Sequence, residues 1–131
     1  MSPTPEEALN YPITERTRFR VRLDLSHSRV PLPVELTPGP FWLRHFTSFE
    51  ACQRAWVAFR SLYDLGMSQC CGGEIFDEQG QHIAQVSYNG RLWPPGEWQP
   101  SKTHAAEAPT ISEEDLRTIA DITGQTLVAE H

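Results

Sequence analysis

Cysteine and histidine are the usual ligands of structural zinc sites, and this chain contains both. Structural zinc sites in short chains hold Cys and His ligands in pairs, about two to five residues apart. The candidates here do not form such pairs, so we predict no metal site and no cofactor. These candidates are Cys52, Cys70, Cys71, His27, His45 and His82.

The same cysteines are the candidates for nucleophilic chemistry. Cys52 falls on the apolar face of an expected helix, where a small core residue fits, whereas Cys70 and Cys71 are expected as exposed thiols in a loop. A catalytic thiol needs a base beside it, and no spacing places a histidine there. Phosphate-binding loops and hydrolase motifs are also missing. We therefore predict no catalytic residue, and a thiol-dependent enzyme using Cys70 or Cys71 stays an alternative.

A run of alternating arginines is the sharpest charged feature of the sequence. It places four of the eleven basic residues on one face of an expected strand. Such a face could bind phosphates or an acidic protein surface, or it could be a solvated face paired with acids on neighbouring strands. No aromatic platform lies on the same strand face, so nucleic-acid binding ranks as an alternative. The arginines are Arg16, Arg18, Arg20 and Arg22.

A second candidate binding site is the end of an expected hairpin. Asn89-Gly90 is a strong tight-turn signal, and a rigid turn loses little entropy when its neighbours bind a partner. Aromatic residues and arginine are the types that anchor interfaces. The alternative is that Tyr88 and Trp93 complete the core. The predicted contact residues for a protein partner are Tyr88, Arg91, Trp93 and Trp98.

The strands that carry these residues are indicated by their patterns. Residues 17–25 alternate strictly between apolar and polar side chains, as in a half-buried strand. After a proline-rich loop over 31–40, residues 41–46 can form a short strand. Further along, we expect a hairpin of strands over 74–77 and 82–88. A brief third strand over 91–93 would end at two prolines.

A central helix should cover the sheet. Ser48 or Thr47 can cap a helix that runs to about Asp64, with Leu65-Gly66 closing it. Apolar residues recur at helical spacing along it, at Phe49, Cys52, Trp56, Phe59 and Tyr63.

A shorter helix is expected near the C-terminus. It should begin after the N-cap Ser112, run from Glu113 to about Thr123, and end at Gly124 as its C-cap. Residues 126–129 would follow as a short strand or a turn.

These elements predict one α+β domain of 131 residues: a small antiparallel sheet of three to five strands, the central helix on one face and a short C-terminal helix. We expect an acidic Pro-rich segment over 1–15, a core over 16–93, a Pro-rich linker over 94–109 and the terminal helix within 110–131. The net charge of −6 is uneven, because the middle has nine bases against seven acids while both ends are acidic.

The composition also limits the cellular setting. No stretch of about 18 apolar residues occurs, and the first residues lack the basic and apolar regions of a signal peptide. Three cysteines, two of them adjacent, do not suggest a disulfide framework. We therefore expect a soluble protein of the reducing cytoplasm.

The segment from residue 46 to 93 carries one resemblance. Gly73-Glu74-Ile75-Phe76-Asp77 and Ser87-Tyr88-Asn89-Gly90-Arg91-Leu92-Trp93, after the central helix, resemble short uncharacterised bacterial proteins often carried by plasmids and other mobile elements. The resemblance implies no activity but a setting, in which small accessory proteins bind host defence complexes, anti-CRISPR inhibitors among them. Our expectation is a non-enzymatic accessory protein that binds a protein partner.

Overall fold

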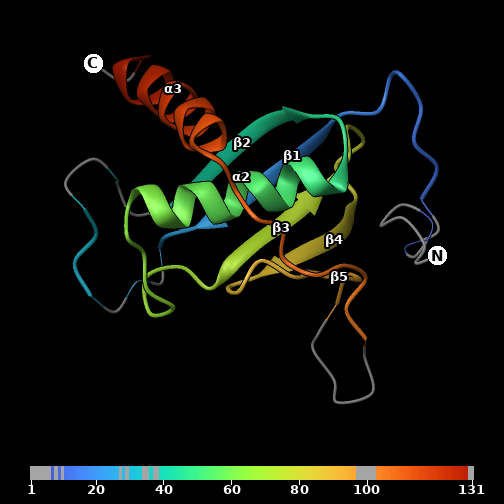
Figure 1. Cartoon of the computed structure of the whole chain (residues 1–131), viewed down its shortest axis with the longest axis horizontal. Coiled ribbons are helices and arrows are strands. Elements are labelled where there is room, and N and C mark those ends of the chain that lie inside the picture. The colour runs from blue at the N-terminus through green and yellow to red at the C-terminus, as the bar shows by residue number, and fades with distance from the viewer. Residues whose placement is uncertain are drawn as a thin grey trace.

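The computed structural model describes residues 7, 9, 11–26, 28, 30–33, 36, 39–96 and 103–129, the last six of these without their side chains. Five antiparallel strands form one sheet in the order β2-β1-β3-β4-β5. One helix lies across a face of this sheet, and a second packs beside the first (Figure 1). The predicted α+β architecture is confirmed. The elements are β1 (Phe19–Asp24), β2 (Pro40–Phe46), α2 (Phe49–Leu62), β3 (Gly72–Phe76), β4 (His82–Ser87), β5 (Leu92–Trp93) and α3 (Glu113–Ala129).

Strand β1 lies inside the sheet and pairs with β2 on one side and β3 on the other. The predicted alternation of buried and outward-facing side chains is confirmed. Phe19, Val21 and Leu23 are fully buried, and the residues between them face outward. The strand begins later than expected. Residues 14–17 form a turn in which the Thr14 amide donates to the Thr17 hydroxyl at 2.9 Å, and β1 begins after this turn. Arginines 16 and 18 therefore precede the strand.

Helix α2 supplies more of the buried core than any other single element. The Ser48 side chain caps it by accepting from the Ala51 amide at 3.1 Å, as the sequence predicts. Trp56 and Phe59 are fully buried against the sheet. The closing position differs from our prediction, because Asp64, not Gly66, adopts positive φ, at 49°. Aspartate is one of the few non-glycine residues that enter this region readily.

Strand β3 begins at Gly72, two residues before the predicted start. Gly72 has φ of 136°, and a Cβ there would lie 2.1 Å from the carbonyl oxygen of Val86 on the neighbouring strand. Only glycine fits this approach. The tight backbone contact holds the start of β3 against the end of β4, where their register pairs Gly72 with Ser87.

Helix α3 begins as predicted, with the Ser112 hydroxyl accepting from the Asp115 amide at 3.3 Å. Our predicted end at Gly124 was wrong, since the helix continues to Ala129 and includes the residues expected as a strand or turn. A glycine inside a helix costs only about 1 kcal/mol, which does not stop a helix that is already packed. Its buried face, with Ile119 and Thr123, lies against α2.

The described part of the predicted linker runs beside the sheet. Leu92 of β5 exchanges backbone hydrogen bonds with residues 105 and 106, at 2.6 Å and 3.0 Å. We call residues 103–108 the strap. Trp98 lies outside the described residues. In the part of the chain that the structure describes, no helix combines the length and apolar character needed to cross a membrane.

Candidate functional site

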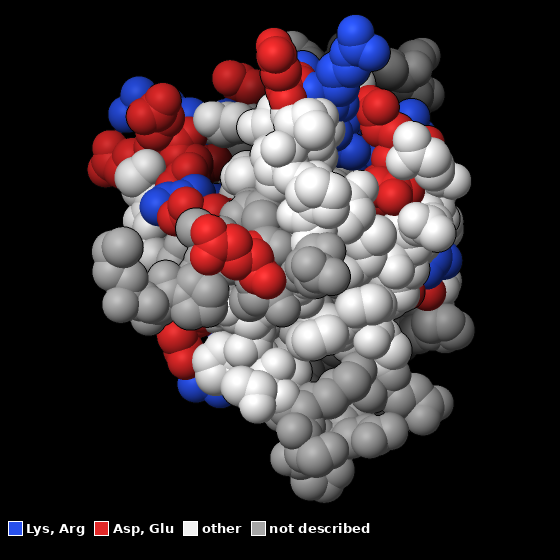
Figure 2. All heavy atoms as spheres, turned by 90° about the vertical axis from the view of Figure 1, so that its right-hand side faces the viewer, with Lys and Arg blue, Asp and Glu red and all other residues white. Residues whose placement is uncertain are grey.

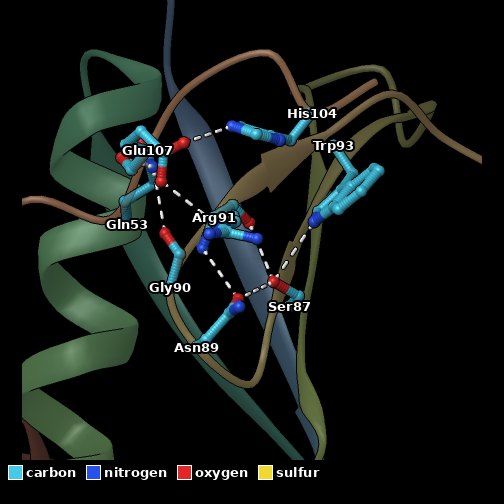
Figure 3. Close-up of polar contacts among 8 residues, drawn as sticks. All are labelled: Gln53, Ser87, Asn89, Gly90, Arg91, Trp93, His104 and Glu107. Carbon is cyan, nitrogen blue, oxygen red and sulfur yellow. Dashed lines mark hydrogen bonds and ion pairs between the residues drawn. The ribbon is translucent and has the colours of Figure 1, made fainter. Parts of the chain in front are cut away.

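The predicted docking turn is tied to the core by a buried amide. The Gln53 side chain, 1% exposed on α2, donates from Nε2 to the Gly90 carbonyl at 3.0 Å and to the Glu107 carbonyl at 2.9 Å (Figure 3). One side chain thereby joins the helix, the β4–β5 turn and the strap. This contact fixes the position of the turn relative to the core.

The turn has the tight geometry that Asn89-Gly90 predicts. The Gly90 amide donates to the Ser87 carbonyl at 2.8 Å, and Gly90 has φ of 91°. A Cβ on Gly90 would approach Val57 of α2 to 2.8 Å, so the turn lies directly on the helix. The Asn89 side-chain oxygen accepts from the Ser87 hydroxyl inside the turn. These contacts make the turn a rigid support.

Trp93 of β5 is held on both sides. Its indole Nε1 donates to the Ser87 hydroxyl at 3.2 Å, and its ring centroid lies 5.5 Å from that of His104 on the strap (Figure 3). The side chain is only partly buried. An aromatic ring is therefore presented at the surface in a fixed orientation.

Arg91 and Glu107 connect the turn to the strap a second time. Arg91 Nε lies 3.1 Å from Glu107 Oε2, and His104 Nε2 lies 2.6 Å from Glu107 Oε1. The hydrogen bond with His104 and the contact with Arg91 lower the pKa of the Glu107 carboxyl. Both oxygens of this carboxylate are thus engaged within the site.

Tyr88 belongs to the edge of the core. Its hydroxyl donates to the Leu65 carbonyl at 2.9 Å, and its ring meets Trp56 edge-on at 6.4 Å. The Arg60 guanidinium lies 5.2 Å from the centre of the Tyr88 ring. Of the four predicted contact residues, Tyr88, Arg91 and Trp93 are partly exposed, with Tyr88 anchored through its hydroxyl, and Trp98 lies outside the described residues.

A hollow of about 760 Å³ opens beside Trp93. Its lining comes from the outer side of β1, the loop over 67–71, the start of β3, and β4 with its turn. Met67, whose exposed fraction of 66% is the largest among the exposed large hydrophobic residues, lines it too. We call this site the Trp93 hollow. The sequence did not indicate Met67 or Glu74 as site residues, because only the pairing of β1, β3 and β4 brings the loop to the turn.

The face of the sheet opposite α2 carries the two arginines that lie on β1. Arg22 forms ion pairs with Glu74 at 3.0 Å and Asp24 at 3.8 Å. Arg20 donates to the Asp77 carbonyl at 3.3 Å and lies over the ring of Trp42 at 5.2 Å. Both side chains are therefore engaged in the fold.

The other two predicted stripe residues lie before β1. The Arg18 guanidinium donates to the Thr17 carbonyl at 2.8 Å, and Arg16 is exposed. Neighbouring strands add aromatic rings that the sequence could not place beside the arginines, since the rings of Trp42 and Phe76 lie 5.5 Å apart. In Figure 2, which views the molecule from the right-hand side of Figure 1, the basic side chains lie beside acidic ones.

The three cysteines differ in exposure. Cys52 is buried and Cys71 is exposed, as predicted, but the prediction of an exposed Cys70 was wrong. Its thiol donates to the Gly72 carbonyl at 3.3 Å, and burial raises its pKa. A thiol with a raised pKa is a weak nucleophile at neutral pH. Among the described residues, no three His, Cys, Asp or Glu side chains lie close enough to hold a metal ion.

The fold and the site together define a small α+β protein with a surface hollow. No protein-family model, curated protein or solved structure matches this chain.

Proposed function

We propose that this protein is a non-enzymatic binder of a protein partner, and that the partner docks on the Trp93 hollow and the adjoining turn. The observation that carries the proposal is the fixed, partly exposed Trp93 at the rim of the hollow. Its indole is oriented by Ser87 and by the His104 ring before any partner arrives. A pre-oriented aromatic residue loses little side-chain entropy on binding.

The size and composition of the hollow support this proposal. A volume of about 760 Å³ lies within the range of roughly 300–1,000 Å³ found for sites that enclose a ligand group. Trp93 and the exposed Met67 supply apolar contact, and Arg91 lies on the same turn. Tryptophan and arginine are the types enriched among residues that dominate interface energies.

The two alternatives have weaker support. For nucleic acid, the β1 arginines would have to exchange existing contacts with Glu74, Asp24 and Asp77 for phosphate. For thiol chemistry, Cys70 is buried, and two of the three described histidines, His82 and His104, lie beside glutamates. Inhibition of a bacterial defence complex, which the sequence resemblance implies, stays a prediction about the partner.

Site-specific crosslinking tests the proposal. A photo-reactive phenylalanine derivative placed at Ser68, in the hollow, should crosslink one protein partner in a bacterial lysate. The same group at Glu78 is the matched control, because that exposed residue lies in the turn at the opposite end of β3 and β4. We expect the Ser68 adduct to be lost in Trp93→Ala and in Met67→Ser.

The variants also define the outcomes that contradict the proposal. Met67 is exposed, so Met67→Ser leaves the fold intact even if Trp93→Ala lowers stability. Equal crosslinking from Ser68 and Glu78 would place docking elsewhere. The same conclusion would follow if the Ser68 adduct survived both substitutions in protein shown by circular dichroism to be folded.

A further inference from the structure

We infer, on the basis of the proposed function, that the Trp93 hollow receives an arginine or lysine side chain from a basic segment of the partner. The positive head would lie at Glu74, and the aliphatic stem would lie along Trp93 and Met67. This assigns the hollow a ligand chemistry that its shape alone does not define.

The first argument is the charge of the lining. Three side chains that are ionised at neutral pH line the hollow, and they are one cation, Arg22, and two anions, Asp24 and Glu74. Both carboxylates lie close to the same guanidinium, so the hollow keeps an excess of one negative charge. The whole chain has the same sign, with a net charge of −6. A basic partner is the complementary one.

The second argument is the hydrogen-bonding state of Glu74. Its Oε1 accepts from the Arg22 guanidinium at 3.0 Å, whereas its Oε2 lies 3.9 Å from His82 Nδ1, beyond hydrogen-bonding distance. The side chain is 41% exposed, more than the 31% of Arg22 and the 29% of Asp24. A carboxylate can accept about four hydrogen bonds. Glu74 is therefore partly exposed and keeps the capacity to accept further hydrogen bonds.

The third argument is the apolar part of the lining. Lysine and arginine carry a stem of methylene groups that packs on apolar surface while the charged end stays near water or an acid. Trp93 offers an aromatic face, which also attracts a cation, and Met67 offers a flexible thioether. An anionic ligand would meet the excess negative charge, and a purely apolar one would leave Glu74 without a new partner.

Short capped peptides test this inference by nuclear magnetic resonance with the full-length protein. The probe is acetyl-Gly-Arg-Gly-amide, and the matched neutral peptide has citrulline in place of arginine. We expect the arginine peptide to shift the Trp93 indole signal and the amides over 68–74. We also expect it to bind more tightly than the citrulline peptide, by up to about fivefold, since this is the upper end of an exposed ion-pair effect. Glu74→Gln should remove this preference, and Glu78→Gln, at an exposed position outside the hollow, should keep it.

Three results would overturn the inference. One is equal binding of the arginine and citrulline peptides to the unmodified protein. This comparison does not depend on whether a variant folds. Another is that the peptide with norleucine in place of arginine binds more tightly than the arginine peptide. The third is no shift around Trp93 with any peptide at about 10 mM, a concentration at which weak single-residue contacts are detectable. If the Ser68 crosslink persisted in any of these cases, the docking site would stand with a different occupant.

Discussion

The side chain of Gln53 donates a hydrogen bond to the main-chain carbonyl of Gly90, 3.0 Å away, and this buried contact sets the β4–β5 turn against helix α2. The same nitrogen also reaches the strap, at the Glu107 carbonyl. This amide is thus one of the groups that attach the rim of the Trp93 hollow to the core. The stability of the docking surface and that of the core are linked at this residue.

Gln53→Leu should destabilise the protein by about 2 kcal/mol or more. Leucine keeps the volume but leaves two carbonyls without their donor, and an unsatisfied buried group costs about 1–3 kcal/mol. Urea denaturation measures the change. Gln79→Leu, at an exposed position, is the control and should have little effect. A Gln53→Leu protein as stable as its parent would show that the Gln53 amide contributes nothing to holding the turn.

Trp56→Ala should cost roughly 3–5 kcal/mol through lost contacts and a cavity. Trp56 is fully buried, and its indole donates to the Tyr88 carbonyl at 3.1 Å. Trp56→Phe should cost clearly less, because it keeps a ring and because Arg60 still donates to the same carbonyl. Thermal melts of both variants test whether Trp56→Ala is the more destabilising of the two. Little change in Trp56→Ala would mean that α2 is not the core helix.

Nucleic-acid binding should be weak or undetectable. The arginines of β1 are paired or stacked within the fold, and the chain has a net charge of −6. Titration of labelled DNA and RNA at low salt measures the affinity. Submicromolar binding that is lost with added salt, and lost when Arg18, Arg20 and Arg22 are changed to Ala, would reverse our ranking of partners.

Asp115→Asn should lower stability by about 1 kcal/mol at neutral pH, the usual effect of a capping group. The hydrogen bond from the Ser112 amide, with a further contact from Arg54, lowers the pKa of this carboxyl from 3.8. Its stabilising effect is therefore complete above the unfolded pKa and is lost as the pH falls through the lower folded value. The difference between variant and parent should shrink below about pH 4. Asp121→Asn, on the exposed side of α3, is the control and should show no such pH dependence.

Gly72→Ala should destabilise the protein more than Gly39→Ala. Both glycines have positive φ, at 136° and 119°, so both substitutions introduce backbone strain of roughly 1–3 kcal/mol. Only at Gly72 does the new methyl group meet a backbone atom, since nothing lies within 4 Å of a Cβ on Gly39. The difference between the two free energies of unfolding isolates the contact between β3 and β4. Equal effects would mean that the strands separate there at little cost.

The sequence predicted which helices and strands form more accurately than it predicted where they begin and end. Alternation in β1 and the helical spacing around Trp56 are local patterns, and both identified the correct elements and buried faces. The ends of helices depend on smaller energies, which is why the predicted stops at Gly66 and Gly124 were wrong. Helix α2 ends before Gly66, at Leu62, because Asp64 takes the positive φ, whereas α3 continues through Gly124 because a glycine can close a helix but is not forced to do so.

Only part of the candidate site could be predicted from the sequence. The Asn89-Gly90 turn and the aromatic residues beside it are close in sequence, so their grouping was predicted. Met67 and Glu74 join Trp93 only through the strand order, and Glu74, the nearer of the two ion-pair partners of Arg22, is 52 residues away in the sequence. Long-range pairing of this kind leaves no periodic signal in one sequence.

The interior place of β1 in the sheet has a consequence for synthesis on the ribosome. One side of β1 can pair as soon as β2 has emerged, but the other side waits until Gly72–Phe76 has been made. During this interval the nascent chain exposes an unpaired strand with an apolar face, which is a template for aggregation. Arg20 and Arg22, alternating with those apolar residues, are the charged side chains that discourage such pairing. The arginines of this strand thus protect the growing chain before they contribute to the finished fold.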